Sequence, residues 1–265
     1  MASAPRTTLW HITISHYSEK ARWALDYKSI PHRLRALVPG AHIPVALWLT
    51  RGRHYTVPVL DLGSQRIGDS TAIIAALEQR HPEPPLYPRA PAQRRRALAL
   101  EEWFDEELGP YIRRFVFHEL GRDRERFAEL GAKAAPQAFR LMGPAGATCA
   151  STLTGLRYRA RSDDASEAAR MKVIAAIDRL EAELGANDYL VGDGFSVADL
   201  TAAALLYPLV LPSEAYVTIE RMPAPVEQLR ARLRKRRGYR WVQEMFRRHR
   251  HPAEAPNGSE TEASA

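Results

Sequence analysis

The pattern of apolar and polar residues divides the chain into an N-terminal part that alternates strands with helices and a C-terminal part made of helices. Residues 7–13 are apolar, aromatic or β-branched for the most part, which predicts a buried strand. Residues 16–28 are rich in helix-favouring Glu, Lys, Ala, Arg and Leu. The apolar residues of 39–50 have no clear period and predict no defined element. The same criteria predict strands at 30–37, 57–60 and 65–67 and a helix at 70–79.

The C-terminal part follows a proline-rich stretch at 83–91, because proline blocks helices and stiffens a linker. Ser196-Val-Ala-Asp199 predicts a helix start of the capping-box kind, with Asp199 in a structural role. Small residues, proline and three glutamates predict a disordered acidic tail at 253–265. Further helices are expected over 92–119, 122–142, 163–185, 224–236 and 239–250. The expected organisation is a first domain at 1–82, a linker at 83–91, a helical domain at 92–252 and the tail.

The turn between the first strand and the first helix carries the clearest chemical signal. A strand that leads directly into a helix leaves backbone N–H groups unpaired at the helix start, where partial positive charge favours an anion such as a thiolate. Ser15 suits the N-cap position, and its hydroxyl can still donate to a bound anion. Ser15 and Ser18 could equally act only as helix caps, and taken by themselves they favour that simpler interpretation.

The N-terminal part resembles the thioredoxin-like domain of the glutathione transferase superfamily. The resemblance rests on three features in the same order, namely the Ser15 turn, the Val57-Pro58 strand and the Asp69-Ser70 helix start. Residues 189–203, Tyr-Leu-Val-Gly-Asp-Gly-Phe-Ser-Val-Ala-Asp-Leu-Thr-Ala-Ala, resemble the helical-domain signature of that superfamily. The resemblance implies an α/β thioredoxin-like N-terminal domain followed by an all-α C-terminal domain.

The resemblance also implies a glutathione site. Ser15 matches the position that donates a hydrogen bond to the glutathione thiolate, and Ser18 is the alternative donor. Pro58 would follow a cis peptide bond and expose the backbone of Val57 to the cysteinyl part of the tripeptide.

The two ends of glutathione would be held by other residues. Asp69 would face the γ-glutamyl ammonium, while Ser70 and the helix N-terminus would face the γ-glutamyl carboxylate. The glycyl carboxylate requires a cation, for which Arg53, His54 and His42 are candidates. The second substrate would lie between the domains, near Trp10, His11, Tyr111, Phe115 and the segment around Tyr158.

The resemblance predicts transfer of glutathione, or of another low-molecular-weight thiol, to a small and mostly apolar electrophile. Two enzymatic alternatives, a glutathione-dependent peroxidase and a dehalogenase, use the same thiolate. A non-catalytic binding protein that retains the fold is the alternative from a different class. A homodimer is also expected.

Charge and cysteine content bear on nucleic-acid binding, metal binding and cellular location. The net charge of +7 comes from residues 229–250, which carry +9. Trp241, Val242, Met245, Phe246 and His249 recur there at helical spacing, so a docked helix with a solvated basic face is favoured over a nucleic-acid-binding arm. No spacing of His or Cys suggests a metal site. Cys149 is the single cysteine, expected to be buried and inert, and the absence of a secretory signal or a membrane-spanning apolar run predicts a cytoplasmic protein.

Overall fold

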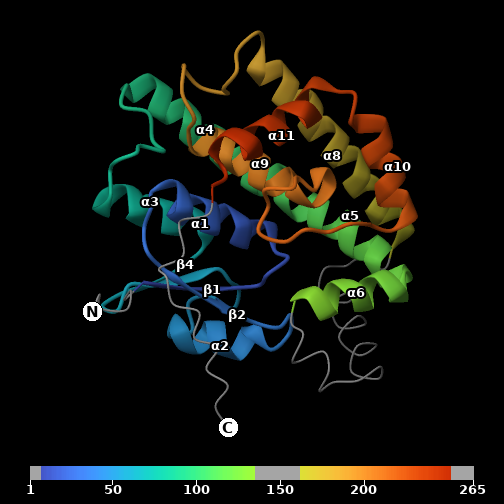
Figure 1. Cartoon of the computed structure of the whole chain (residues 1–265), viewed down its shortest axis with the longest axis horizontal. Coiled ribbons are helices and arrows are strands. Elements are labelled where there is room, and N and C mark those ends of the chain that lie inside the picture. Colours follow the sequence, from blue (N-terminus) through green and yellow to red (C-terminus); the bar gives the residue numbers. More distant parts are fainter. Residues whose placement is uncertain (1–6, 135–161, 252–265) are drawn as a thin grey trace.

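The computed structural model describes residues 7–134 and 162–251. It confirms the expected fold class, an α/β region with a small sheet followed by a region of helices (Figure 1). Cys149, Tyr158 and the predicted tail at 253–265 lie outside the described residues, so the predictions about them are not addressed by the structure.

The N-terminal region is built on a four-stranded sheet with the strand order β2-β1-β3-β4. Strands β1 and β2 are parallel, β3 is antiparallel to β1, and β4 is antiparallel to β3. Helices α1 and α3 cover the sheet face that turns towards the helical region, and α2 lies on the opposite face (Figure 1). The elements are β1 (Thr8–His11), α1 (His16–Tyr27), β2 (Arg33–Ala36), α2 (His42–Leu49), β3 (Val59–Asp61), β4 (Arg66–Gly68) and α3 (Ser70–Arg80).

The helical region packs around α9, whose residues are all buried. This helix is apolar on every side, as a helix at the centre of a core should be. It contacts α1 of the sheet region as well as α4, α5 and α11, so one hydrophobic core joins the two regions. The helices are α4 (Pro91–Glu107), α5 (Gly109–Arg122), α6 (Arg124–Ala134), α8 (Asp163–Leu184), α9 (Val197–Val210), α10 (Ala224–Leu233) and α11 (Arg237–His249).

The predicted capping box at the start of α9 is confirmed. The Asp199 carboxylate accepts hydrogen bonds from the backbone amide and the hydroxyl of Ser196, at 2.9 and 2.7 Å. It also accepts one from the Leu190 amide at 2.8 Å. Burial raises the pKa of Asp199 to about 6, although these hydrogen bonds act in the opposite direction.

Two predicted elements are corrected by the structure. The single helix expected over 92–119 is two helices that meet at Leu108, and Pro110 lies in the first turn of α5, where its missing N–H breaks no hydrogen bond. The segment 39–50 contains α2. This helix has apolar residues on all sides, and Leu47 and Trp48 remain exposed, which explains why the segment shows no clear period.

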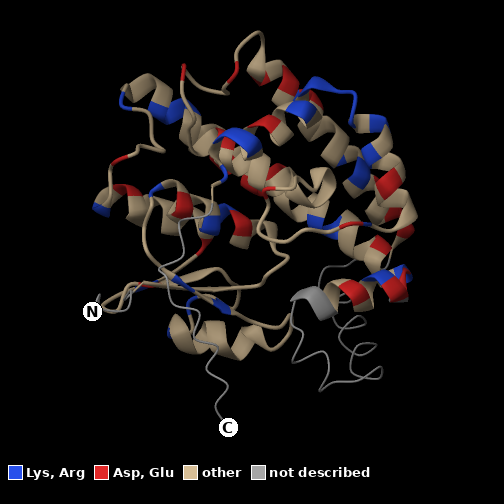
Figure 2. Ribbon diagram, in the orientation of Figure 1, with Lys and Arg blue, Asp and Glu red and all other residues tan. Residues whose placement is uncertain are grey.

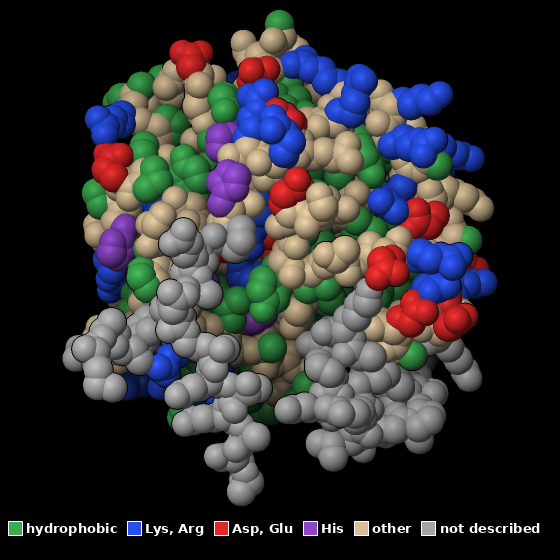
Figure 3. Space-filling model, in the orientation of Figure 1, with side chains coloured by type: hydrophobic (Ala, Val, Ile, Leu, Met, Phe, Trp, Pro, Cys, Tyr) green, Lys and Arg blue, Asp and Glu red, His purple; other side chains and the backbone are tan. Residues whose placement is uncertain are grey.

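The C-terminal helix α11 carries the predicted apolar stripe, since Trp241, Val242, Met245 and Phe246 are buried. Lys and Arg side chains gather over α10, α11 and the turn between them (Figures 2 and 3). Arg250 departs from the predicted solvated face, because it is buried and paired with acidic residues of α1.

Candidate active site

The turn between β1 and α1 leaves one serine open to a ligand. Ser15 is the N-cap of α1 and half-buried, and its Oγ accepts a hydrogen bond from the Ser18 amide at 3.3 Å. That bond uses a lone pair, so the hydroxyl proton of Ser15 can still be donated. Ser18 has no exposed surface, and its Oγ accepts from the Ile12 amide at 3.3 Å. Ser18 therefore helps to hold the turn together, and of the two serines only Ser15 has surface that a ligand can reach.

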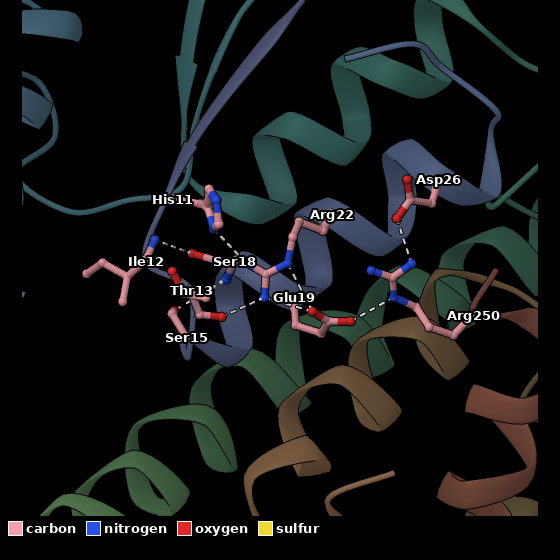
Figure 4. A network of polar contacts seen from close by, with 9 residues as sticks. All are labelled: His11, Ile12, Thr13, Ser15, Ser18, Glu19, Arg22, Asp26 and Arg250. Carbon is pink, nitrogen blue, oxygen red and sulfur yellow. Dashed lines mark hydrogen bonds and ion pairs between the residues drawn. The ribbon is translucent and has the colours of Figure 1, made fainter. Parts of the chain in front are cut away.

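A buried ionic network lies behind this turn and fixes its shape (Figure 4). The Arg22 guanidinium donates to Glu19 at 2.7 Å and to the Thr13 carbonyl at 3.1 Å, and it lies 2.7 Å from Nδ1 of His11. Burial, together with the neighbouring Arg22, lowers the pKa of His11 to about 3, so this imidazole is neutral at physiological pH.

The far end of the chain completes the network. Arg250 follows α11 and donates to Glu19 at 2.7 Å and to Asp26 at 2.6 Å (Figure 4). Burial alone would raise the pKa of Glu19, but Arg22 and Arg250 lower it overall. The end of α11 is thereby tied to the helix whose N-terminus forms the turn.

The N-terminus of α3 lies on the second wall of the site. Asp69 is its N-cap, and one carboxylate oxygen accepts from the amides of Thr71 and Ala72, both at 3.0 Å. Asp69 has a φ of 75°, a backbone conformation that non-glycine residues seldom adopt and that is often found at functional sites. Ser70 follows and is buried.

A cavity of about 610 Å³ brings several of the predicted residues together. Val57, Pro58, Asp69 and Ser70 line it, and the peptide bond between Val57 and Pro58 is cis. Tyr17, two residues beyond Ser15, lines the same cavity. Four residues predicted from separate parts of the sequence thus lie around one space next to the Ser15 turn.

The opposite wall of this cavity is acidic and comes from α4, which contributes Glu101, Glu102, Asp105 and Glu106. Lys20 of α1, which has no exposed surface, pairs with Glu101 at 2.9 Å and with Asp105 at 2.6 Å. Burial raises the pKa of Glu101, whereas Lys20 acts in the opposite direction. The wall remains rich in carboxylates.

A second, small cavity of about 30 Å³ lies on the other side of the turn. Ile14 and His16, which flank Ser15 in sequence, both line it, as does Tyr207 of α9. Arg113 of α5 lines this cavity and the large one as well. The two residues that flank Ser15 therefore border the small cavity, Tyr17 borders the large one, and Arg113 borders both.

Comparison with known proteins now identifies the family. Residues 9–85 match the glutathione S-transferase N-terminal domain, and residues 163–244 match the glutathione S-transferase C-terminal domain. The chain belongs to the glutathione S-transferase superfamily.

Solved glutathione S-transferases share its fold. One from Methylobacterium radiotolerans, in complex with glutathione sulfonate, is 24% identical with a TM-score of 0.54 and covers 89% of this chain and 93% of its own. A theta-class enzyme from Xanthomonas axonopodis pv. citri with glutathione bound is 21% identical with a TM-score of 0.53. The match covers 90% of this chain and 97% of that enzyme. A curated relative, FtsZ-localized protein A of Caulobacter vibrioides, is 26% identical over 211 residues, 75% of each chain.

The three cations proposed for the glycyl end of glutathione are not among the residues that line the large cavity of this transferase-fold protein. Arg53 is exposed. His54 is half-buried and packs so closely against Gly68 that a Cβ there would lie 2.6 Å from the imidazole. His42 is buried, and its Nδ1 accepts a hydrogen bond from the Gly40 amide at 3.0 Å.

The residues proposed for the second substrate are also placed elsewhere. His11 is fully buried in the Arg22 network, and Trp10 packs against the minor apolar cluster that contains residues of α2. Tyr111 and Phe115 line neither cavity beside the turn. The sequence analysis does not point to Tyr207, although a tyrosine in an otherwise apolar helix is a signal. It does not point to the i,i+4 carboxylates Glu101 and Asp105 either, because the apolar residues between them indicate only a core-facing helix.

None of the described helices is both long enough and apolar enough to span a membrane. Within residues 7–134 and 162–251, no group of three or more His, Cys, Asp or Glu is arranged to hold a metal ion.

Proposed function

We propose that this protein conjugates glutathione to small, mostly apolar electrophiles in the cytoplasm. The observation that carries the proposal is the common cavity of Val57, Pro58, Asp69 and Ser70 beside the half-exposed Ser15. The tripeptide would occupy this large cavity and the electrophile would enter from the side of the small one. The glutathione-bound transferases with the same fold support the choice of thiol.

The proposed chemistry needs no side-chain nucleophile. The Ser15 hydroxyl donates a hydrogen bond to the thiolate of glutathione, and the N-terminus of α1 adds favourable partial charge, so both lower the pKa of the thiol. The thiolate then attacks an electrophilic carbon, the S–C bond forms, and the leaving group departs with its bonding electron pair. The network of Arg22 and Glu19 holds the turn in place and does not touch the substrates.

The test is the ionisation of bound glutathione in the parent and in Ser15→Ala, measured by thiolate absorbance against pH. We expect Ser15→Ala to raise the pKa of the thiol and to lower kcat/KM for 1-chloro-2,4-dinitrobenzene at least tenfold, because a positioned donor is lost. Ser18→Ala is the comparison variant, since Ser18 belongs to the same turn but is buried and lines neither cavity, and it should shift the pKa of the thiol less than Ser15→Ala does. If the titration and kcat/KM are the same in Ser15→Ala and the parent, the assignment fails.

A non-catalytic role is the second candidate, favoured by the similarity to FtsZ-localized protein A and by the acidic wall of α4. Glutathione carries two carboxylates, and the large cavity offers them one arginine, Arg113, against Asp69 and the four acidic residues of α4. In this alternative the protein associates with FtsZ polymers. Calorimetry with glutathione and co-sedimentation with FtsZ polymers separate the two candidates, because each predicts binding in one assay only.

A further inference from the structure

Two buried polar atoms beside the Ser15 turn lack hydrogen-bond partners. Nε2 of His16 and the hydroxyl of Tyr207 are both inaccessible to solvent, and neither has a partner among the described residues. His16 is 4% exposed and Tyr207 is 1% exposed. Both residues line the small cavity, whose other walls are mostly apolar. Polar atoms buried in this way are uncommon, because leaving them unpaired is costly.

Both groups are uncharged at physiological pH. Burial, with a contribution from Arg113, lowers the pKa of His16 to about 3. Burial also raises the pKa of Tyr207 well above its usual range. The cavity therefore offers hydrogen bonds but not a charge from either residue.

The direction of each hydrogen bond follows from the neighbours. A hydrogen bond between the His16 ring and the Gly109 backbone acts to raise the pKa of His16. A bond with this effect is one in which a ring N–H donates to Gly109. A neutral imidazole has only one N–H, so the remaining nitrogen, Nε2, is an acceptor. The Tyr207 hydroxyl has a proton to donate. The Tyr207 oxygen can also accept, so a group that pairs with both residues must donate to His16 and can pair with Tyr207 in either direction; only a group that both donates and accepts can also use the Tyr207 proton.

A hydroxyl group meets this requirement and can use the Tyr207 proton as well, whereas acceptor-only and cationic substituents fit poorly. A carbonyl oxygen or a halogen can only accept, which leaves His16 unpaired. An ammonium can only donate, and it would be repelled by Arg113. The volume of about 30 Å³ admits a group the size of one or two water molecules.

We propose that the small cavity is a hydroxyl-binding subsite, and that the electrophile accepted by this protein is an apolar molecule with a terminal hydroxyl group. The choice of electrophile rests on the transferase function proposed above, but the binding of a hydroxyl does not. With the hydroxyl held between His16 and Tyr207, the apolar body of the molecule extends towards Ser15.

Binding is tested first, with benzyl alcohol and toluene titrated by calorimetry into the full chain. We expect benzyl alcohol to bind at least tenfold more tightly than toluene. In Tyr207→Phe, which removes only the unpartnered hydroxyl, the preference should fall below threefold. The matched control is Tyr239→Phe, because the Tyr239 hydroxyl already donates to the Val210 carbonyl at 3.0 Å and does not line the cavity. Equal binding of the two probes, no binding of benzyl alcohol, or an unchanged preference in Tyr207→Phe would overturn the subsite.

Conjugation is tested second, with 4-(hydroxymethyl)benzyl chloride and 4-methylbenzyl chloride. In each case the glutathione sulfur forms a bond to the benzylic carbon, and chloride leaves with the electron pair of the C–Cl bond. We expect kcat/KM to favour the hydroxymethyl compound at least tenfold in the parent and in Tyr239→Phe, but not in Tyr207→Phe.

The two experiments separate the two proposals. If benzyl alcohol shows the Tyr207-dependent preference but neither chloride is conjugated, the subsite stands and the transferase function fails. If both chlorides are conjugated at equal rates and benzyl alcohol shows no preference, the transferase function stands and the subsite fails.

Discussion

Replacement of Arg250 by methionine should lower the free energy of unfolding by about 3 kcal/mol. Arg250 is 3% exposed and makes ion pairs of 2.7 Å with Glu19 and 2.6 Å with Asp26. Removing one partner of a buried ion pair typically costs about 3–5 kcal/mol, because the other charge is left uncompensated. Arg22 still neutralises Glu19 in the variant, so we expect the lower end of that range.

The assay is urea denaturation followed by circular dichroism, with a thermal melt as a second measure. About 3 kcal/mol corresponds to a fall in Tm of roughly 6–12 °C for a protein of this size. Arg240→Met is the control, because Arg240 lies on α11, the helix that Arg250 follows, and is exposed, and it should change stability by no more than about 0.5 kcal/mol. A loss below about 1 kcal/mol in Arg250→Met would refute the structural role of the network.

The pH dependence provides a second check on the same variant. The pKa of Glu19 is lowered in the folded protein, so the stability that its charge contributes is present above the ordinary carboxyl range and is lost as pH falls. The difference between parent and Arg250→Met should therefore shrink as the pH is lowered below about 4. A difference that stays constant down to pH 3 would show that lost packing, and not lost charge pairing, destabilises the variant.

Three further predictions follow from the site and the core. Asp69→Asn keeps a cap oxygen but removes the charge, so calorimetry should show glutathione binding about tenfold weaker with little change in stability; equal affinity would exclude Asp69 from the site. The pKa of Asp199 is raised to about 6 in the folded protein. The stability that its protonated carboxyl contributes is therefore fully present below about pH 4 and is lost as pH rises to about 6. The parent should lose up to about 3 kcal/mol over that range relative to Asp199→Asn, and parallel profiles would contradict this. The expected homodimer should give twice the 29.8 kDa chain mass by light scattering, and a single-chain mass would disprove it.

Four of the predicted binding residues came together because each belongs to a local motif with its own geometry. Val57 and Pro58 form the cis bond before β3, while Asp69 and Ser70 form the start of α3. The prediction of Arg53 rests on its charge, and Arg53 does not line the cavity. Charge alone does not specify the direction in which a loop side chain points.

The sequence alone determined the features that depend on neighbours along the chain. Ser15, Asp69 and Ser196 are caps because each hydroxyl or carboxylate reaches backbone amides two or three residues away, and α9 is buried because none of its faces is polar. The tertiary structure alone decided which distant residues meet. Arg250 is separated from Glu19 by 231 residues, and its basic neighbours gave no sign that it would be buried. Helix α9 packs against α1 and α11 packs against α9, which brings both the buried ion pair and Tyr207 to the Ser15 turn. The spacing of apolar residues along the chain does not encode that packing.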